Sequence, residues 1–106
     1  MTYLFAQADV CRLPLPDRSV DLVIGSPPYM NARLYLEGGT DMGISRDAHE
    51  WVAWMLDVSR ECLRVSRGAV IWIAAGVTRD RNYWPGVEGL MWEWFKLGGD
   101  CHQSRP

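Results

Sequence analysis

The sequence predicts an α/β fold in which a parallel sheet, part of a doubly wound architecture, is flanked by helices. Two short segments, residues 20–24 and 69–74, are apolar on both faces, which is typical of strands buried in a parallel sheet. Apolar residues between them recur at helical spacing. A strand, a crossover helix and a second strand form a βαβ unit, whose strands run parallel. The 106 residues allow one domain of typical size.

The composition is that of a folded protein without an overall basic charge. Apolar residues make up 48% of the chain and six tryptophans supply large areas for burial, which argues against disorder. The formal net charge of −2 excludes a strong basic field, so any contact with nucleic acid must be local. The three cysteines lack C-x-x-C spacing, so neither a disulfide framework nor a zinc site is expected. No apolar run approaches the roughly 18 residues of a membrane span, and we expect a cytoplasmic protein.

The first part of the chain is expected to contain two strands and a proline-rich connection. Residues 3–8 are aromatic and aliphatic and end at Asp9, which predicts a strand that runs into a loop. Residues 13–17 contain two prolines, which remove backbone donors and exclude a helix interior. The strand over residues 20–24 then stops abruptly at Gly25, where a serine and two prolines follow.

The rest of the chain is expected to form a long loop, two helices and another strand. Residues 30–46 have no helical or alternating period and predict a loop of unusual length. Asp47 and Glu50 resemble a capping box for a helix with apolar residues at positions 51, 54, 55, 58, 62 and 65. Gly68 is a suitable stop for this helix, before the strand over residues 69–74. Pro85 opens a final helix with apolar positions 87, 90, 91 and 94.

An unusual tetrapeptide follows the first central strand, at the carboxyl end where open α/β sheets bind ligands. Its residues are Ser26-Pro27-Pro28-Tyr29. This sequence resembles the catalytic motif of the DNA amino methyltransferases, which act on the N4 amine of cytosine or the N6 amine of adenine. Residues 8–10 and 13–23 resemble the family's approach to the motif, and residues 63–68 resemble the helix end and turn that follow it. The resemblance covers most of residues 6–75.

The resemblance implies a Rossmann-like methyltransferase sheet, S-adenosylmethionine as cofactor and DNA as substrate. Asp9 matches the acidic residue that holds the adenine of the cofactor. Residues 26–29 match those around the target amine. Arg33 and Tyr35, in the loop that follows, are candidate contacts to DNA.

The chemistry of methyl transfer explains why these residue types suit the motif. An exocyclic amine is a poor nucleophile because its lone pair is delocalised into the ring. A backbone carbonyl of the Pro27-Pro28 pair and the Ser26 hydroxyl can accept both N–H bonds, which favours a pyramidal nitrogen aimed at the methyl sulfonium. Proline suits this role because it fixes φ and offers no competing donor. Tyr29 is expected to stack on the base after it is flipped out of the duplex.

The sequence departs from the family because it lacks a glycine-rich turn resembling F-x-G-x-G between a strand and a helix. Residues 38–39 follow no strand and residues 95–99 close a helix, so neither has the required context. In permuted members the catalytic half precedes the cofactor half, so we interpret the chain as a truncated catalytic half that is inactive alone. Half of a doubly wound sheet exposes a strand edge and apolar faces, which predicts a complementary half or self-association. The aromatic residues Trp92, Trp94 and Phe95 are candidates for such an exposed surface.

Several of these residues have a plainer interpretation. The tetrapeptide can be a rigid turn, and Asp9 an ordinary strand terminus or helix cap. Arg33 and Tyr35 can be solvated loop residues. His49 and His102 have no partners at ligand spacing, so we expect both at the surface and no metal.

The tryptophans on the two central elements are expected in the core. Trp51, Trp54 and Met55 form a helical stripe, and Trp72 lies on a buried strand.

The whole chain has an alternative function as a non-catalytic α/β remnant that oligomerises or binds a partner. Nucleotide hydrolysis and nicotinamide chemistry are disfavoured because the glycine loops that they require are absent from the sequence.

Overall fold

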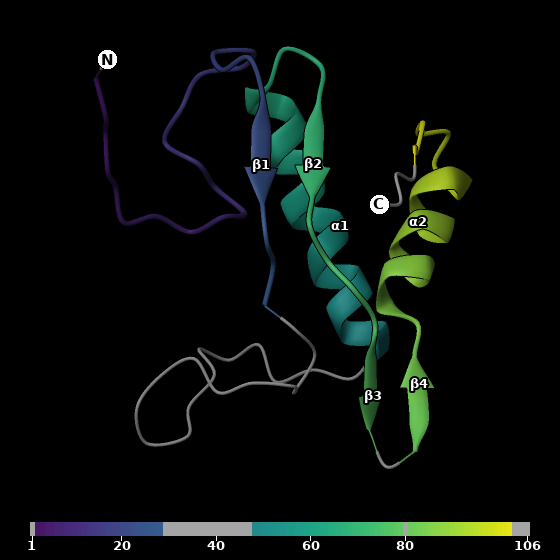
Figure 1. The fold of residues 1–106 in the computed structure, drawn as a ribbon. Coiled ribbons are helices and arrows are strands. Elements are labelled where there is room, and N and C mark those ends of the chain that lie inside the picture. Colours follow the sequence, from purple (N-terminus) through teal and green to yellow (C-terminus); the bar gives the residue numbers. More distant parts are fainter. Residues whose placement is uncertain (1, 29–47, 80, 103–106) are drawn as a thin grey trace, which may run out of the picture.

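A computed structural model of the chain describes residues 2–28, 48–79 and 81–102. Its elements in chain order are β1 (Val23–Gly25), α1 (Ala48–Val65), β2 (Val70–Trp72), β3 (Val77–Arg79), β4 (Asn82–Trp84) and α2 (Gly86–Lys96) (Figure 1). The strands form two separate two-stranded sheets, one parallel and one antiparallel. The protein is therefore α/β in a broad sense. A doubly wound sheet stays a prediction.

The parallel pair of β1 and β2 confirms the predicted βαβ unit. Val23 lies opposite Val70, Ile24 opposite Ile71 and Gly25 opposite Trp72. The pairing extends past the strand end, where the backbone N–H of Ile73 donates to the carbonyl of Gly25 at 2.9 Å. Helix α1 connects the two strands and packs behind them (Figure 1).

The two faces of this sheet are not equally covered. Val23, Val70 and Trp72 face α1 and pack against the core. On the opposite face Ile24 is 60% exposed and Ile71 is 45% exposed. The prediction that both strands are buried on both faces is therefore wrong for the described residues. The physical reason is that α1 covers one face, whereas the described part of the chain places no element over the other (Figure 1).

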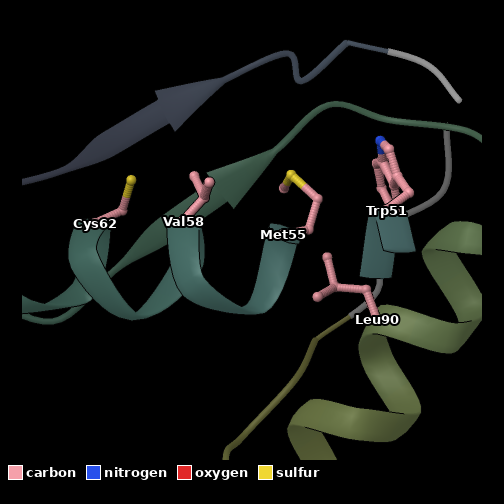
Figure 2. Packing of buried hydrophobic residues seen from close by; sticks show 5 residues of the cluster. All are labelled: Trp51, Met55, Val58, Cys62 and Leu90. Atoms are coloured by element: carbon pink, nitrogen blue, oxygen red, sulfur yellow. The ribbon is translucent and has the colours of Figure 1, made fainter. Parts of the chain in front are cut away.

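The core forms along α1, as its apolar spacing predicts. The buried side chains of this helix are Trp51, Met55, Val58, Ser59, Cys62 and Val65. Leu90 of α2 packs against this stripe (Figure 2). Trp54 and Trp72 are partly buried against the same cluster, so their assignment to the core is confirmed in this weaker form. Asp47, the predicted cap of α1, lies outside the described residues.

Helix α2 begins directly after Pro85, as predicted, and ends at Lys96. Backbone N–H groups of residues 97–99 donate to the carbonyls of Trp94 and Phe95, which closes the last turn. Gly98 has a φ of +84°, a left-handed conformation that glycine adopts without steric cost. Neither α1 nor α2, the helices within the described ranges, has the length and hydropathy of a membrane span.

The strand predicted over residues 3–8 is absent, and this prediction is wrong. The segment has no regular secondary structure and pairs with no described strand, and Leu4 and Phe5 are 92% and 94% exposed. Its aromatic and aliphatic composition favours a strand, but a strand needs a neighbour for its backbone hydrogen bonds. The sequence pattern alone does not supply that neighbour.

The hairpin of β3 and β4 was not predicted from the sequence. Thr78 lies opposite Tyr83, and the tight connection includes Arg81 with a φ of +64°. The tyrosine ring folds back over Gly76, where a Cβ atom would lie 2.4 Å from the phenol oxygen. Because the turn lacks the glycine that marks most two-residue hairpins, its sequence signal is weak.

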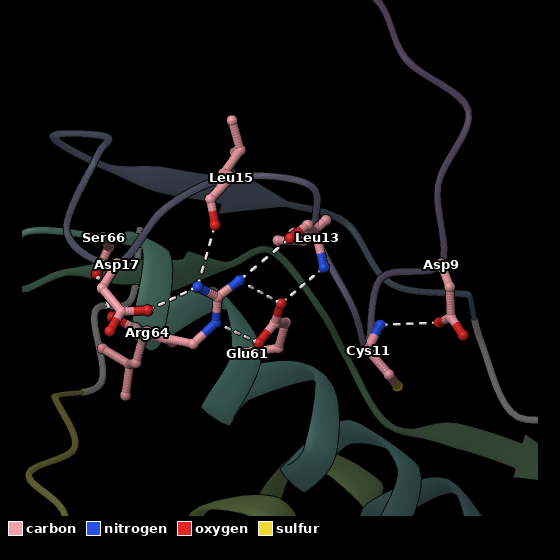
Figure 3. A network of polar contacts seen from close by, with 9 residues as sticks. Asp9, Cys11, Leu13, Leu15, Asp17, Glu61, Arg64 and Ser66 are labelled. Carbon is pink, nitrogen blue, oxygen red and sulfur yellow. Dashed lines mark hydrogen bonds and ion pairs between the residues drawn. The ribbon is translucent and has the colours of Figure 1, made fainter.

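The proline-rich connection before β1 is held against α1 by one ion-pair cluster (Figure 3). The guanidinium of Arg64 contacts Glu61 at 2.7 Å and Asp17 at 2.7 Å, and donates to the carbonyls of Leu13 and Leu15. Glu61 in turn accepts the backbone N–H of Leu13 at 2.6 Å. The hydrogen bond from Arg64, followed by that from Leu13, lowers the pKa of the Glu61 carboxyl to about 2. A segment without regular structure is thus fixed in place.

Candidate functional site

The candidate site is the motif that directly follows β1, at the carboxyl edge of the parallel pair. This is the position predicted from the sequence. Ser26 is exposed, Pro27 is buried and Pro28 is half-buried. The serine side chain is therefore open to solvent, whereas the two prolines are anchored to the fold. Tyr29, the fourth residue of the motif, lies outside the described residues.

Trp72 fixes the residue before the motif. A Cβ atom built on Gly25 would lie 2.9 Å from Cζ3 of the Trp72 ring, so only glycine fits there without a shift. The indole Nε1 of Trp72 donates to the hydroxyl of Ser59 on α1 at 3.0 Å. The ring is therefore held by both packing and a hydrogen bond, and it sets how closely β1 and β2 approach at the site.

Trp51 fixes the other end of the motif. Its indole Nε1 donates to the backbone carbonyl of Pro28 at 2.8 Å. The side chain is only 2% exposed and belongs to the core cluster around Met55 and Leu90. Figure 2 shows the indole ring rising from the N-terminal end of α1 toward the segments that leave the two strands. The motif is thus bracketed by two tryptophans from different elements.

Two backbone carbonyls at the ends of this segment already accept a hydrogen bond from another part of the fold. The Gly25 carbonyl accepts from Ile73, and the Pro28 carbonyl accepts from Trp51. Among the residues that the structure describes, none donates to the Pro27 carbonyl or to the Ser26 hydroxyl. Within the described residues these two groups therefore keep their capacity to accept hydrogen bonds, which binding of an exocyclic amine requires.

Asp9 lies in a separate turn on the N-terminal segment (Figure 3). One oxygen of its carboxylate accepts the backbone N–H of Cys11 at 2.8 Å, and its carbonyl accepts the N–H of Arg12. This is the local turn that aspartate commonly forms, and it agrees with the plainer interpretation of Asp9. The residue is exposed, so the carboxylate stays accessible to a ligand.

The remaining residues singled out in the sequence lie either outside the described residues or at the surface. Arg33 and Tyr35, the candidate contacts to DNA, lie outside the described residues. His49 and His102 are both exposed, as expected. Within the described ranges, no three or more side chains of the metal-binding types cluster together. Burial raises the pKa of the Cys62 thiol, which disfavours its thiolate and a nucleophilic role.

Two hollows on the described surface lie away from the motif. The larger, with a volume of about 460 Å³, is open and is lined by Cys11 and by residues of α1, namely Asp57, Arg60, Glu61 and Arg64. A smaller one of about 250 Å³ lies between the start of α1 and the start of α2. Neither is lined by Ser26, Pro27 or Pro28.

Comparison with known proteins leaves the chain without an assigned family. It matches no protein-family model, no curated protein sequence and no solved structure. The case for a function therefore depends on the motif and its geometry.

Sequence reasoning assigned Trp51 to the core and missed its contact with the motif. The assignment is correct for burial, but the indole N–H also needs an acceptor when it is buried. The sequence feature that could have indicated this contact is the position of Trp51 in the first turn of α1, the helix that follows β1 along the chain.

Proposed function

We propose that the chain is the catalytic half of an S-adenosylmethionine-dependent methyltransferase that acts on an exocyclic amine of cytosine or adenine in DNA. One observation carries this proposal. The Ser26-Pro27-Pro28 segment follows a strand of a parallel pair, and no described residue donates to the Ser26 hydroxyl or to the Pro27 carbonyl. The similarity of the surrounding sequence to the family supports the same conclusion.

The two acceptors have a defined role in the reaction. They bind the two N–H groups of the target amine, which turns the nitrogen lone pair out of conjugation and toward the methyl carbon. S-adenosylmethionine, when bound, would supply the methyl group: the nitrogen would attack the methyl carbon as the carbon–sulfur bond breaks, and the bonding electron pair would go to sulfur. The methylated ammonium then loses one proton to water. No covalent intermediate with the protein is needed.

The remaining predicted residues serve the substrate and the cofactor. Tyr29 stacks on the flipped base, and Arg33 and Tyr35 contact the DNA strand. Asp9 holds the adenine of S-adenosylmethionine through its exposed carboxylate. The chain has no glycine-rich turn for the methionine end of the cofactor, so a complementary half supplies that part of the site. Cofactor binding by this chain alone is accordingly weak.

A second function is favoured by the uncovered sheet face. Ile24, Ile71 and Ile73 all project from the face opposite α1 and are about half or more exposed. Parallel sheets in folded proteins are almost always covered on both faces, so this surface is suited to binding another polypeptide. A non-catalytic module that associates through this face would retain the fold without the reaction.

Methyl transfer to DNA tests the proposal. The purified chain is incubated with unmethylated DNA and methyl-labelled S-adenosylmethionine, alone and mixed with the cofactor half of a permuted amino methyltransferase. Nucleoside mass spectrometry then identifies the product. We expect background transfer by the chain alone and N4-methylcytosine or N6-methyladenine from the mixture, because the two halves share a sheet edge and apolar faces.

Variants of the motif provide the control. Tyr29→Ala is expected to lose about 1–3 kcal/mol of base stacking, whereas Tyr29→Phe retains most activity. Calorimetric titration of the chain with S-adenosylmethionine separates the two functions, since weak binding supports the enzyme and no binding supports the module. No binding together with no transfer in the mixture contradicts the enzymatic proposal. Robust transfer by the chain alone contradicts its interpretation as half of an enzyme.

A further inference from the structure

We propose that Trp51 is a positioning residue for methyl transfer, because its indole N–H anchors the C-terminal end of the stiff Ser26-Pro27-Pro28 segment to the core and so holds the acceptors of Ser26 and Pro27 in place. The inference rests on the proposed function. It goes beyond it by assigning a role to a core residue outside the motif. The starting observation is the 2.8 Å hydrogen bond from Nε1 of Trp51 to the Pro28 carbonyl, between residues that lie 23 positions apart.

The backbone torsions of the motif explain why this one bond matters. The pyrrolidine rings fix φ at Pro27 and at Pro28. A residue that precedes proline is restricted to extended conformations, which limits ψ at Ser26 and at Pro27. The segment from Ser26 to Pro28 therefore moves as one stiff unit, and its position in the fold depends on what holds its two ends.

The hydrogen bond from Trp51 holds the C-terminal end of this unit through the Pro28 carbonyl. At the other end, the carbonyl of Gly25 accepts the backbone N–H of Ile73. With both ends attached, the acceptors of Ser26 and Pro27 keep one position relative to the sheet, and the nitrogen lone pair of a bound amine has one direction.

The donor itself is held rigidly. Trp51 is 2% exposed and packs in the cluster with Met55 and Leu90, which ties the start of α1 to α2. A surface residue could release the carbonyl by rotating its side chain, but a ring in this core cannot rotate without opening the packing. The packing of the core therefore limits how far the Pro28 carbonyl can move.

The experiment compares Trp51→Phe with Trp84→Phe in the two-component transfer assay. Both replace a tryptophan ring that packs in or against the core cluster by a smaller ring, but the hydrogen bond to the Pro28 carbonyl comes from Trp51, whereas Trp84 lies on β4. We measure kcat and the KM for DNA separately, after confirming by chemical denaturation that each variant is folded. Trp51→Phe is expected to lower kcat by about ten- to hundred-fold with little change in KM, since misplaced groups cost rate. Trp84→Phe is expected to leave both near the wild-type values.

A second replacement covers the case in which Trp51→Phe fails to fold. Installing 3-benzothienylalanine at Trp51 by chemical synthesis keeps the size of the ring and removes only the N–H donor, and the same fall in kcat is expected. Equal kcat for the wild type and this analogue overturns the inference while leaving the proposed function intact. Absence of transfer by the wild-type mixture is a different result, because it counts against the proposed function itself.

Discussion

Replacing Gly25 by alanine tests how closely the site depends on the contact between β1 and the Trp72 ring. The added Cβ would lie 2.9 Å from Cζ3 of Trp72, about 0.5 Å closer than the 3.4 Å at which ordinary contact begins. The φ of Gly25 is not in the left-handed region, so alanine meets no backbone penalty there. In the folded state the substitution therefore acts through packing.

The ring has little freedom to move away. Its indole Nε1 is bonded to Ser59 at 3.0 Å, and its position opposite Gly25 is set by the strand register. The added methyl group therefore requires that this hydrogen bond breaks or that β1 moves away from β2. Overpacking of this kind costs about 1–3 kcal/mol. In a chain of this size each kcal/mol lowers the melting temperature by roughly 4–8 °C.

A double-mutant cycle isolates the contact. Gly25→Ala, Trp72→Phe and the double variant are compared with the wild type by urea denaturation. Phenylalanine lacks the outer ring atom that the new methyl group meets, so the double variant should be less destabilised than the sum of the single ones, by about 0.5–3 kcal/mol. Strict additivity would show that the alanine methyl group does not meet Trp72, and the packing argument would be refuted.

Two further predictions concern the core and the ion-pair cluster. Met55→Ala removes a fully buried side chain and should cost about 2–5 kcal/mol in denaturation, whereas Ile24→Ala on the uncovered face should stay within about 0.5 kcal/mol; similar losses would contradict the assigned core. The pKa of Glu61 is about 2 in the folded chain against 4.5 as its ordinary value, so its contribution to stability is present above pH 4.5 and is lost as the pH falls through 2. Stability measured across this range should therefore fall less for Glu61→Gln than for the wild type, and equal slopes would show that Arg64 does not depress this pKa.

Local sequence patterns predicted the helices and the parallel pair well. The stripe from Trp51 to Val65 predicts α1 because its spacing matches the helical period, and Pro85 marks the start of α2. The βαβ order of elements predicts parallel strands because a crossover helix can return the chain to the same end of the sheet, where the next strand begins in the same direction. These features depend on residues that are near in sequence or on a general rule of topology.

Features that depend on distant partners were not predictable in the same way. Residues 3–8 have strand composition, but no described strand pairs with them. The apolar residues of 20–24 and 69–74 predict two covered faces, whereas Ile24 and Ile71 show that the described chain covers one. The position of the motif could be predicted from the strand before it, but the bond from Trp51 to Pro28 could not, since it depends on the packing of α1.

The two tryptophans that hold the motif also determine when it takes its final shape during synthesis. Translation proceeds from the N-terminus, so Pro28 leaves the ribosome before Trp51, and Trp72 follows later still. Until Trp72 is available to pack beside Gly25, and Trp51 to donate to the Pro28 carbonyl, nothing in the described fold fixes either end of the motif. All residues of the motif are therefore synthesised well before the contacts that fix the motif can form.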